Sequence, residues 1–173
     1  MKKQDTLENQ ASQIYLAIGS NLGNKTNNIN VAKFELQKYK IKIIKSSSNY
    51  ISESWPNNSM PSYVNVIIKI KTSLRPLDLL EVCNMIELRM GRIREKKNFP
   101  RTCDIDIIDY DNAVLCIHKN KLILPHPRMN KRNFVLLPLF EVDKSWIHPK
   151  SKSNIVKLIN SLRIKDLRSI KQI

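Results

Sequence analysis

Two aspartates, Asp104 and Asp106, interrupt the most apolar strand-like run of the chain, RTCDIDIIDY at 101–110. Successive side chains on a strand point to opposite faces, so the two carboxylates share one face while Ile105 and Ile107 share the other. Two such anions, backed by apolar packing, raise each other's pKa unless a cation compensates. Mg²⁺ is commonly held by one or two carboxylates together with water and phosphate oxygens. The pattern suggests a magnesium site, and a solvated strand face with two ordinary aspartates is the alternative.

A basic run comes directly before this pair. Its cations, five within ten positions, are Arg92, Arg94, Lys96, Lys97 and Arg101. Fixed cations beside a Mg²⁺ site suit phosphate transfer, because charge develops on the nonbridging phosphate oxygens. Arginine fits this role since its planar fork can donate two hydrogen bonds to one phosphate. The sequence has no G-x-x-x-x-G-K-[ST] motif, so phosphate binding here does not use a P-loop. A solvated charge run is the alternative.

Two further stretches carry side chains that could bind a heterocycle and phosphates. SWPNNSMPSYVN, at 54–65, offers two aromatic planes and one amide, from Trp55, Tyr63 and Asn65. An amide donates and accepts at once, which matches a heterocycle edge, while aromatic faces stack on it. LPHPRMNKRNFVLLPLFE, at 124–141, holds His126, Arg128, Arg132 and Phe134. Taken alone, each of these residues is better explained by core packing or a turn, although the two arginines beside His126 make phosphate contact credible.

The composition is that of a globular chain that can fold as one domain. The 173 residues are 42% hydrophobic, which suffices for a core without disulfides. The formal net charge is +15, but the excess comes mostly from scattered lysines, so it does not by itself indicate a nucleic-acid partner. We expect a single domain over 1–173, with a polar N-terminal leader at 1–13 and a basic C-terminal tail, able to form helix, at 150–173.

Signals for secretion, membrane insertion and thiol–metal chemistry are missing from the sequence. Cys83, Cys103 and Cys116 show neither C-x-x-C nor Cys/His ligand spacing, which favours free thiols in a reducing compartment. No run of about 18 apolar residues occurs, and the start MKKQDTLENQ lacks an apolar signal segment. We therefore expect a soluble cytoplasmic protein with neither a membrane nor a nucleic-acid partner.

The elements that must position these residues follow from periodicity and turn signals. Strands are expected at 14–21, 41–54, 62–71 and 101–110, and helices at 25–39, between Pro76 and Gly91, and at 153–163. The order strand, helix, strand, strand, helix, strand is similar to the ferredoxin-like split βαβ arrangement. The expected fold class is therefore α+β, with an antiparallel sheet and helices packed on one face.

Five stretches, in order and spacing, make the chain resemble the 6-hydroxymethyl-7,8-dihydropterin pyrophosphokinase family of folate biosynthesis. They are YLAIGSNLGN, YISESWPNNSMPSYVN, IELRMGRIR, PRTCDIDII and LPHPRMNKRNFVLLPLFE. They cover about residues 14–148, and five ordered motifs are far more specific than any one alone. The resemblance implies a ferredoxin-like α+β fold, two Mg²⁺ ions, ATP as co-substrate and a reduced pterin held between aromatic side chains. A monomer is expected.

The resemblance also implies roles for individual positions. Asp104 and Asp106 match the family's Mg²⁺-binding pair, and Arg92 and Arg101 match its catalytic-loop arginines. The positions that fall near the nucleotide are Glu87, His126 and Arg132. The positions that fall on the pterin pocket are Ser52, Trp55, Tyr63, Asn65 and Phe134.

Three positions depart from the family's usual pattern. Ser52 and Ser54 replace the usual threonine and proline of the pterin loop, and Ser52 retains a hydroxyl. Phe99 stands where glycine is common. A phenylalanine there stiffens a loop expected to close over ATP, which predicts an effect on rate rather than on the reaction.

The resemblance implies that the pterin hydroxymethyl oxygen attacks the β-phosphorus of ATP and releases AMP, and the sequence places no residue as the general base. A metal-dependent phosphatase or nuclease is an alternative that would use the same carboxylate pair, but it leaves Trp55, Tyr63, Asn65 and Phe134 unexplained. A basic RNA-binding module on a four-stranded sheet is a second alternative. This sequence lacks the aromatic residues of RNP motifs in its expected strand, and Asp104 and Asp106 would lie where an RNA backbone binds.

Overall fold

The computed structural model describes residues 13–54, 59–92, 99–119 and 122–173. Its strands are β1 (Ile14–Ser20), β2 (Lys42–Ser46), β3 (Tyr50–Ser52), β4 (Tyr63–Lys71), β5 (Asp104–Tyr110), β6 (Leu115–Ile117), β7 (Leu122–Leu124) and β8 (Ile170–Gln172). Its helices are α1 (Lys25–Lys38), α2 (Pro76–Arg89), the 3₁₀ turn η1 (Met129–Lys131), α3 (Asn133–Val142), α4 (Ile155–Asn160) and α5 (Ile164–Arg168).

The main sheet has the strand order β5-β1-β4-β3-β8, and β2 pairs with β4 beside β3. The pairings along this order are antiparallel. β6 and β7 form a separate hairpin. The elements follow one another in the expected ferredoxin-like order, with β2 and β3 together as its second strand: β1, α1, β2 and β3, β4, α2 and β5. The α+β prediction is therefore confirmed. The run expected as one strand at 41–54 divides into β2 and β3, because the Ser47 hydroxyl enters the ladder and accepts a 3.0 Å hydrogen bond from the Ile67 amide.

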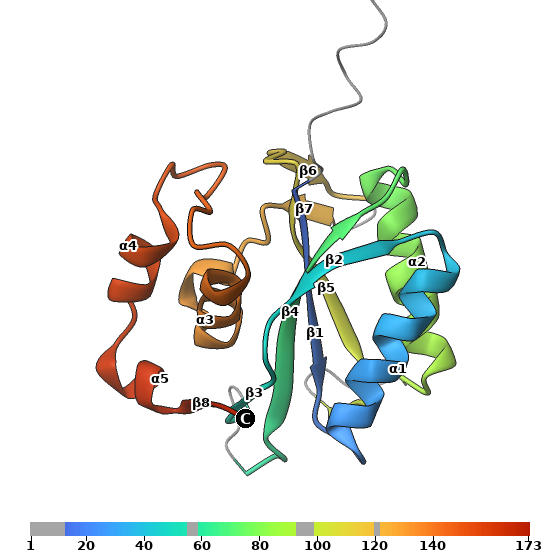
Figure 1. Cartoon of the computed structure of the whole chain (residues 1–173), viewed down its shortest axis with the longest axis horizontal. Coiled ribbons are helices and arrows are strands. Elements are labelled where there is room, and N and C mark those ends of the chain that lie inside the picture. The colour runs from blue at the N-terminus through green and yellow to red at the C-terminus, as the bar shows by residue number, and fades with distance from the viewer. Residues whose placement is uncertain (1–12, 55–58, 93–98, 120–121) are drawn as a thin grey trace, which may run out of the picture.

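Helices cover both faces of the sheet, as Figure 1 shows. α1 and α2 pack on the face that presents Leu16 and Ile18, where the larger core cluster lies. α3 packs on the opposite face, around Tyr15 and Ile67, and α4 packs on the outer side of α3. The narrower expectation of helices on one face is therefore wrong, because the apolar residues that follow Arg132 form a helix that buries the second face.

α1 and α2 form where the sequence predicts them, for identifiable local reasons. Asn24 caps α1 by accepting a hydrogen bond from the Asn27 amide at 3.1 Å. Pro76 opens α2 at a position where its missing N–H costs nothing. Gly91 lies just past the end of α2 with φ of +83°, a conformation that a side chain would strain.

The edge strand β5 contains a β-bulge where it pairs with β1. Ile107 pairs with Leu16 and Asp109 pairs with Tyr15, so Ile108 is the extra residue. As a result the Asp109 carboxylate is fully buried in the second core, where its Oδ2 accepts a 2.9 Å hydrogen bond from Trp146 Nε1. Asp109 Oδ1 is buried and has no hydrogen-bond partner in the described part of the chain. Burial raises the pKa of Asp109 to about 6.

This buried carboxylate predicts a pH-dependent component of stability. A pKa raised from 3.8 to about 6 means that the folded protein binds more protons than the unfolded chain between these values, so stability falls as pH rises through this window. Asp109→Asn mimics the protonated form. We expect the variant to match wild type near pH 4 and to exceed its unfolding free energy by up to about 3 kcal/mol above pH 6. Urea unfolding at several pH values measures this difference, and a pH-independent difference would contradict it.

The region after residue 150 differs from a simple tail. The helix expected at 153–163 ends at Asn160, because the Ser161 hydroxyl donates to the Leu158 carbonyl and Arg163 is extended. β8 then joins the main sheet beside β3. The leader expected at 1–13 lies outside the described residues except for Gln13. Within the described ranges, no helix combines the length and the apolar character needed to cross a bilayer.

Candidate active site

A cavity of about 740 Å³ opens on the sheet face that α3 covers. Its floor is formed by three neighbouring strands, since Asp104 on β5 pairs with Gly19 on β1, and Gly19 pairs with Asn65 on β4. Neighbouring strands lie about 4.8 Å apart, so the carboxylate of Asp104 and the amide of Asn65 arise roughly 10 Å apart on one surface. The arrangement gives the cavity a carboxylate end and an amide end.

Gly19 keeps the floor between these two ends open. A Cβ on residue 19 would lie 3.0 Å from Asn65 Oδ1 and 3.5 Å from Tyr63 Cδ1. The backbone there is ordinary strand, so the requirement for glycine comes from the close approach of the neighbouring side chains and not from conformation. A larger residue would therefore displace the side chains that line the amide end.

Nine of the twelve residues singled out from the sequence line this cavity. They are Ser52, Tyr63, Asn65, Arg92, Arg101, Asp104, Asp106, Arg132 and Phe134. Glu87 and His126 are not among its lining residues, and each contacts one that is. Trp55 lies outside the described residues, as do Arg94, Lys96 and Lys97.

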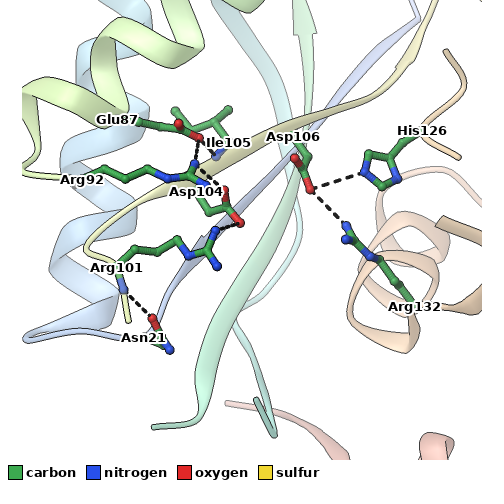
Figure 2. Close-up of polar contacts among 9 residues, drawn as sticks. All are labelled: Asn21, Glu87, Arg92, Arg101, Asp104, Ile105, Asp106, His126 and Arg132. Carbon is green, nitrogen blue, oxygen red and sulfur yellow. Dashed lines mark hydrogen bonds and ion pairs between the residues drawn. The ribbon is translucent and has the colours of Figure 1, made fainter. Parts of the chain in front are cut away.

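Asp104 is held by two arginines from the segments on either side of the loop after α2. Arg92 Nη1 lies 2.5 Å from its Oδ1, and Arg101 Nη1 lies 3.3 Å from its Oδ2, as Figure 2 shows. Burial and then the neighbouring Asp106 raise the pKa of Asp104, while Arg101 and Arg92 act in the opposite direction. Asp106 therefore raises the pKa of Asp104, as their shared strand face predicts, and the two arginines offset this rise only in part.

Glu87 supports this arrangement from behind. Its side chain is almost fully buried, and its Oε1 lies 2.5 Å from Arg92 Nη1. The same Oε1 accepts a 2.7 Å hydrogen bond from the Ile105 amide on β5 (Figure 2). Glu87, in the last turn of α2, thus ties this helix to β5 and fixes the direction of Arg92.

Asp106 has a different set of cationic and polar neighbours. Arg132 Nη1 lies 3.0 Å from its Oδ2, and His126 Nε2 lies 3.7 Å from the same oxygen. Both arrive from the segment between β7 and α3, on the side opposite to Arg92 and Arg101 (Figure 2). Burial lowers the pKa of His126 to about 4, so the imidazole is neutral near pH 7. The two carboxylates therefore hold separate partners, with the space between them open to the cavity.

Arg101 retains a donor that no described residue uses. Its backbone N–H donates to Asn21 Oδ1 at 2.7 Å, and its carbonyl accepts from the Asn21 amide at 3.1 Å. These two bonds fix the end of the loop, while Arg101 Nε is buried without a hydrogen-bond partner in the described ranges. Buried donors are nearly always paired, so this one is suited to a ligand oxygen. Sequence reasoning assigned no role to Asn21, which lies in the stretch YLAIGSNLGN.

The donor set fits Mg²⁺ bound together with phosphates. Two carboxylates, Asp104 and Asp106, face one space, and burial together with the nearby Asp106 raises the pKa of Asp104. Among the described residues there is no group of three or more His, Cys, Asp or Glu side chains that could enclose a metal ion. Mg²⁺ held by one or two carboxylates completes its shell with water and substrate phosphates, which is the kind of site that these residues offer.

The opposite end of the cavity offers an amide, hydroxyls and aromatic rings. Asn65 Nδ2 donates to Ser52 Oγ at 2.9 Å, and both side chains are buried. Ser52 therefore keeps a hydroxyl contact despite its departure from threonine. Tyr63 and Phe134 lie on different segments, β4 and α3, and both line the cavity. The Arg132 guanidinium lies over the Phe134 ring at 5.5 Å from its centroid, which connects this end to Asp106.

Part of the cavity wall comes from residues that sequence reasoning did not select. Apart from Ser54 and Arg128, which sequence reasoning did consider and which also line the cavity, they are Glu53, Lys131, Asn133, Arg163, Lys165, Asp166 and Ser169, together with Ala17 and Gly19. Four of them belong to the segment after α4, at 163–169. No catalytic motif marks that segment. Its only local signal is an Arg-x-x-Asp spacing, and Arg163 and Asp166 do form a two-bond ion pair, at 2.8 and 3.0 Å.

Curated relatives share this sequence over most of its length. The chain is 36% identical over 148 residues to a Synechocystis 2-amino-4-hydroxy-6-hydroxymethyldihydropteridine pyrophosphokinase, covering 85% of this chain and 74% of the relative. It is 37% identical over 139 residues to the Haemophilus influenzae protein of the same name, covering 80% and 86%. It is also 32% identical over 170 residues to the Folic acid synthesis protein fol1 of Pneumocystis carinii, covering 98% of this chain and 22% of that protein. The chain thus spans about a fifth of the longer relatives.

Solved structures share its fold. A crystal structure of Plasmodium falciparum HPPK-DHPS with pterin and p-hydroxybenzoate matches with a TM-score of 0.71 at 17% identity, covering 97% of this chain and 48% of that one. A crystal structure of HPPK-DHPS in complex with substrates matches with a TM-score of 0.70 at 14% identity, covering 94% and 47%. At these identities the likeness concerns the fold alone.

The family model named 7,8-dihydro-6-hydroxymethylpterin-pyrophosphokinase matches residues 15–144. That range includes Asp104 and Asp106, the arginines that hold them and the amide end of the cavity. The match and the identities with full-length pyrophosphokinases establish the family, so the chain belongs to the 7,8-dihydro-6-hydroxymethylpterin-pyrophosphokinase family.

Proposed function

We propose that this chain transfers pyrophosphate from ATP to the hydroxymethyl group of 6-hydroxymethyl-7,8-dihydropterin and releases AMP. The observation that carries the proposal is the single cavity that joins a carboxylate and arginine end to an amide and aromatic end across β5, β1 and β4. A phosphate donor and a flat heterocycle bound at these ends would meet above Gly19. Family membership supports the same reaction.

At the phosphate end, Asp104 and Asp106 would hold Mg²⁺. Mg²⁺ supplies charge neutralisation at the phosphate oxygens when it is bound. Arg92 and Arg101 would offset the negative charge that develops on the transferred group, and Arg101 Nε, which has no hydrogen-bond partner among the described residues, would donate to this group. Arg132 and His126 would lie on the nucleotide side of Asp106, and Glu87 would act by fixing Arg92.

At the heterocycle end, the pterin ring would stack on Phe134 and Tyr63 and place its polar edge on Asn65 and Ser52. The Asn65 amide keeps its carbonyl oxygen toward the cavity floor while Nδ2 donates to Ser52. In this orientation the hydroxymethyl oxygen points to the phosphate end. The new bond joins that oxygen to the β-phosphorus, and the bond from the β-phosphorus to the α-phosphate bridging oxygen breaks, so AMP leaves.

The products of ATP test this proposal directly. The protein is incubated with ATP, Mg²⁺ and 6-hydroxymethyl-7,8-dihydropterin, and AMP, ADP and inorganic phosphate are quantified. Pyrophosphoryl transfer forms AMP in a 1:1 ratio with pterin consumed, and omission of pterin or chelation of Mg²⁺ abolishes it. ADP as the product would instead indicate ordinary kinase action. Pterin-independent release of inorganic phosphate would indicate the phosphatase alternative.

The alternative functions fit the structure less well. A phosphatase or nuclease leaves the buried Asn65–Ser52 pair and the Phe134 ring without a purpose in the cavity. An RNA-binding platform needs an open sheet face, whereas α1 and α2 cover one face and α3 covers the other. Two bound Mg²⁺ ions, a monomeric state, a single domain over 1–173 and a cytoplasmic location stay predictions. Metal titration and light scattering test the first two.

A further inference from the structure

Asn133, the first residue of α3, uses its side-chain amide in both directions. Its Oδ1 accepts a 2.7 Å hydrogen bond from the Phe134 backbone amide. Its Nδ2 donates to the Asp166 carbonyl and, at 3.1 Å, to Ser169 Oγ. Ser169 Oγ in turn donates to the same Asp166 carbonyl at 2.9 Å. The side chain is 8% exposed, so these bonds lie in a largely dry environment where a lost partner is costly.

The segment that Asn133 contacts, 163–172, is also fixed to the sheet. Ile170 pairs with Ser52 and Gln172 pairs with Tyr50, which adds β8 to the edge at β3. Gln172 Nε2 donates to Ser48 Oγ at 2.9 Å, which secures the end of the segment. The segment therefore joins two parts of the amide end of the cavity, the strand that carries Ser52 and the helix start that carries Phe134.

We propose that residues 163–172 form the outer wall of the heterocycle end of the cavity, and that Asn133 is a positioning residue that locks this wall to Phe134. The inference rests on the proposed function for the identity of the heterocycle. Asn133 touches no reacting atom. It acts by holding the Phe134 backbone at the distance from Ser52 and Asn65 that admits one flat ring.

The wall is expected to affect the binding of pterin but not the binding of ATP, so the proposal can be tested by comparing the two. Asp104 and Asp106 take their partners from Arg92, Arg101, Arg132 and His126, and none of these contacts involves 163–172. Loosening the wall is therefore expected to weaken pterin binding while the affinity for ATP·Mg²⁺ is kept. A general loss of structure would weaken both.

The variant Asn133→Ala removes the acceptor for Phe134 and both donors to the wall. We expect the KM for 6-hydroxymethyl-7,8-dihydropterin to rise about tenfold or more, with the KM for ATP changed less than twofold. Asn133→Asp keeps the acceptor for the Phe134 amide but places a negative charge against the Asp166 carbonyl. We expect Asn133→Asp to raise the pterin KM nearly as much as Asn133→Ala does. That result would assign the effect to the lost bonds with the wall, because the bond with the Phe134 amide is kept.

Asn154→Ala is the matched control. Asn154 also accepts a backbone hydrogen bond at a helix start, from the Lys157 amide at 2.8 Å, but it does not line the cavity. It should lower thermal stability by a similar amount and leave both KM values unchanged. Equal rises of both KM values in Asn133→Ala, or a pterin KM that matches the control, would overturn the positioning role.

Hydrogen exchange of the protein without substrates keeps this test independent of the reaction. Asn133→Ala is expected to speed amide exchange at 133–136 and at 166–172 together, because the two segments are joined through this side chain. Asn154→Ala should speed exchange only at 155–160. Exchange confined to one of the two segments in Asn133→Ala would refute the wall. Failure of the wild type to consume pterin, with the joint exchange effect present, would refute the proposed reaction and keep the wall.

Discussion

Replacing Asp106 by asparagine is expected to lower turnover by on the order of 10³-fold or more, with the fold intact. Asp106 and Asp104 are the carboxylates that face the cavity together with the arginines, and an asparagine keeps the size of the side chain while removing its charge. Loss of a metal ligand at a phosphate site removes several kcal/mol of stabilisation, and each 1.36 kcal/mol is about one decade in rate. AMP formation at saturating Mg²⁺ measures the effect.

Stability should change in the opposite sense to activity. The raised pKa of Asp104 means that its ionised form is disfavoured in the folded protein, first by burial and second by Asp106. Asp106→Asn removes the second cause, so the apo variant is expected to unfold at the same temperature as wild type or higher. Retained turnover in Asp106→Asn would contradict the metal assignment. A large loss of thermal stability would show that Asp106 serves the fold instead.

Asp78→Asn is a suitable control for this comparison. Asp78 is partly exposed, belongs to the first turn of α2 and forms an ion pair with Arg75 at 2.8 Å. Its removal takes away one carboxylate and one ion pair without touching the cavity. Activity within a factor of two of wild type is expected, because exposed pairs contribute little.

The carboxylate pair could be predicted from the sequence because strand alternation is a local rule. Asp104 and Asp106 share the cavity face, and Ile105 and Ile107 lie in the core on the other side, as expected. The same rule could not locate the bulge at Ile108. A bulge is decided by the pairing of β5 with β1, which no local pattern in β5 encodes.

α3 shows a second reason why sequence reasoning was incomplete. Its residues, NFVLLPLFEV, are apolar on nearly all sides and include Pro138 in the helix interior. Helical periodicity is visible only when one face is polar, and a proline argues against a helix interior. Here the helix is buried between the sheet and α4, so both signals fail. The covering of the second sheet face could not be read from this stretch.

The contribution of 163–172 to the cavity was missed because it depends on long-range contacts. Ser169 meets Asn133 across 36 positions, and Ile170 meets Ser52 through β8. Neither residue belongs to a motif with a chemical signature. By contrast Arg92, Arg101 and Asp104 lie within 13 positions of one another, and their proximity on the loop and the strand made their contact predictable.

Replacing Arg101 by lysine is expected to lower kcat by about 10²-fold while the affinity for ATP changes little. Lysine keeps the positive charge near Asp104 but loses the planar fork and the Nε donor. That donor is buried and has no hydrogen-bond partner in the described part of the chain. The Arg101 main chain remains held by Asn21, because those two bonds use backbone atoms and survive the substitution.

Arg75→Lys is the matched control, since Arg75 contacts Asp78 with the same three-residue spacing that Arg101 has to Asp104, but on the exposed start of α2. It should leave kcat within a factor of two of wild type. Single-turnover kinetics and direct titration with a nonhydrolysable ATP analogue separate the chemical step from binding. If Arg101→Lys lowers analogue affinity as much as it lowers kcat, Arg101 is a ground-state binding residue. If only kcat falls, the buried Nε is a donor whose partner forms in the transition state, which is where a fixed arginine on a phosphate site has its largest effect.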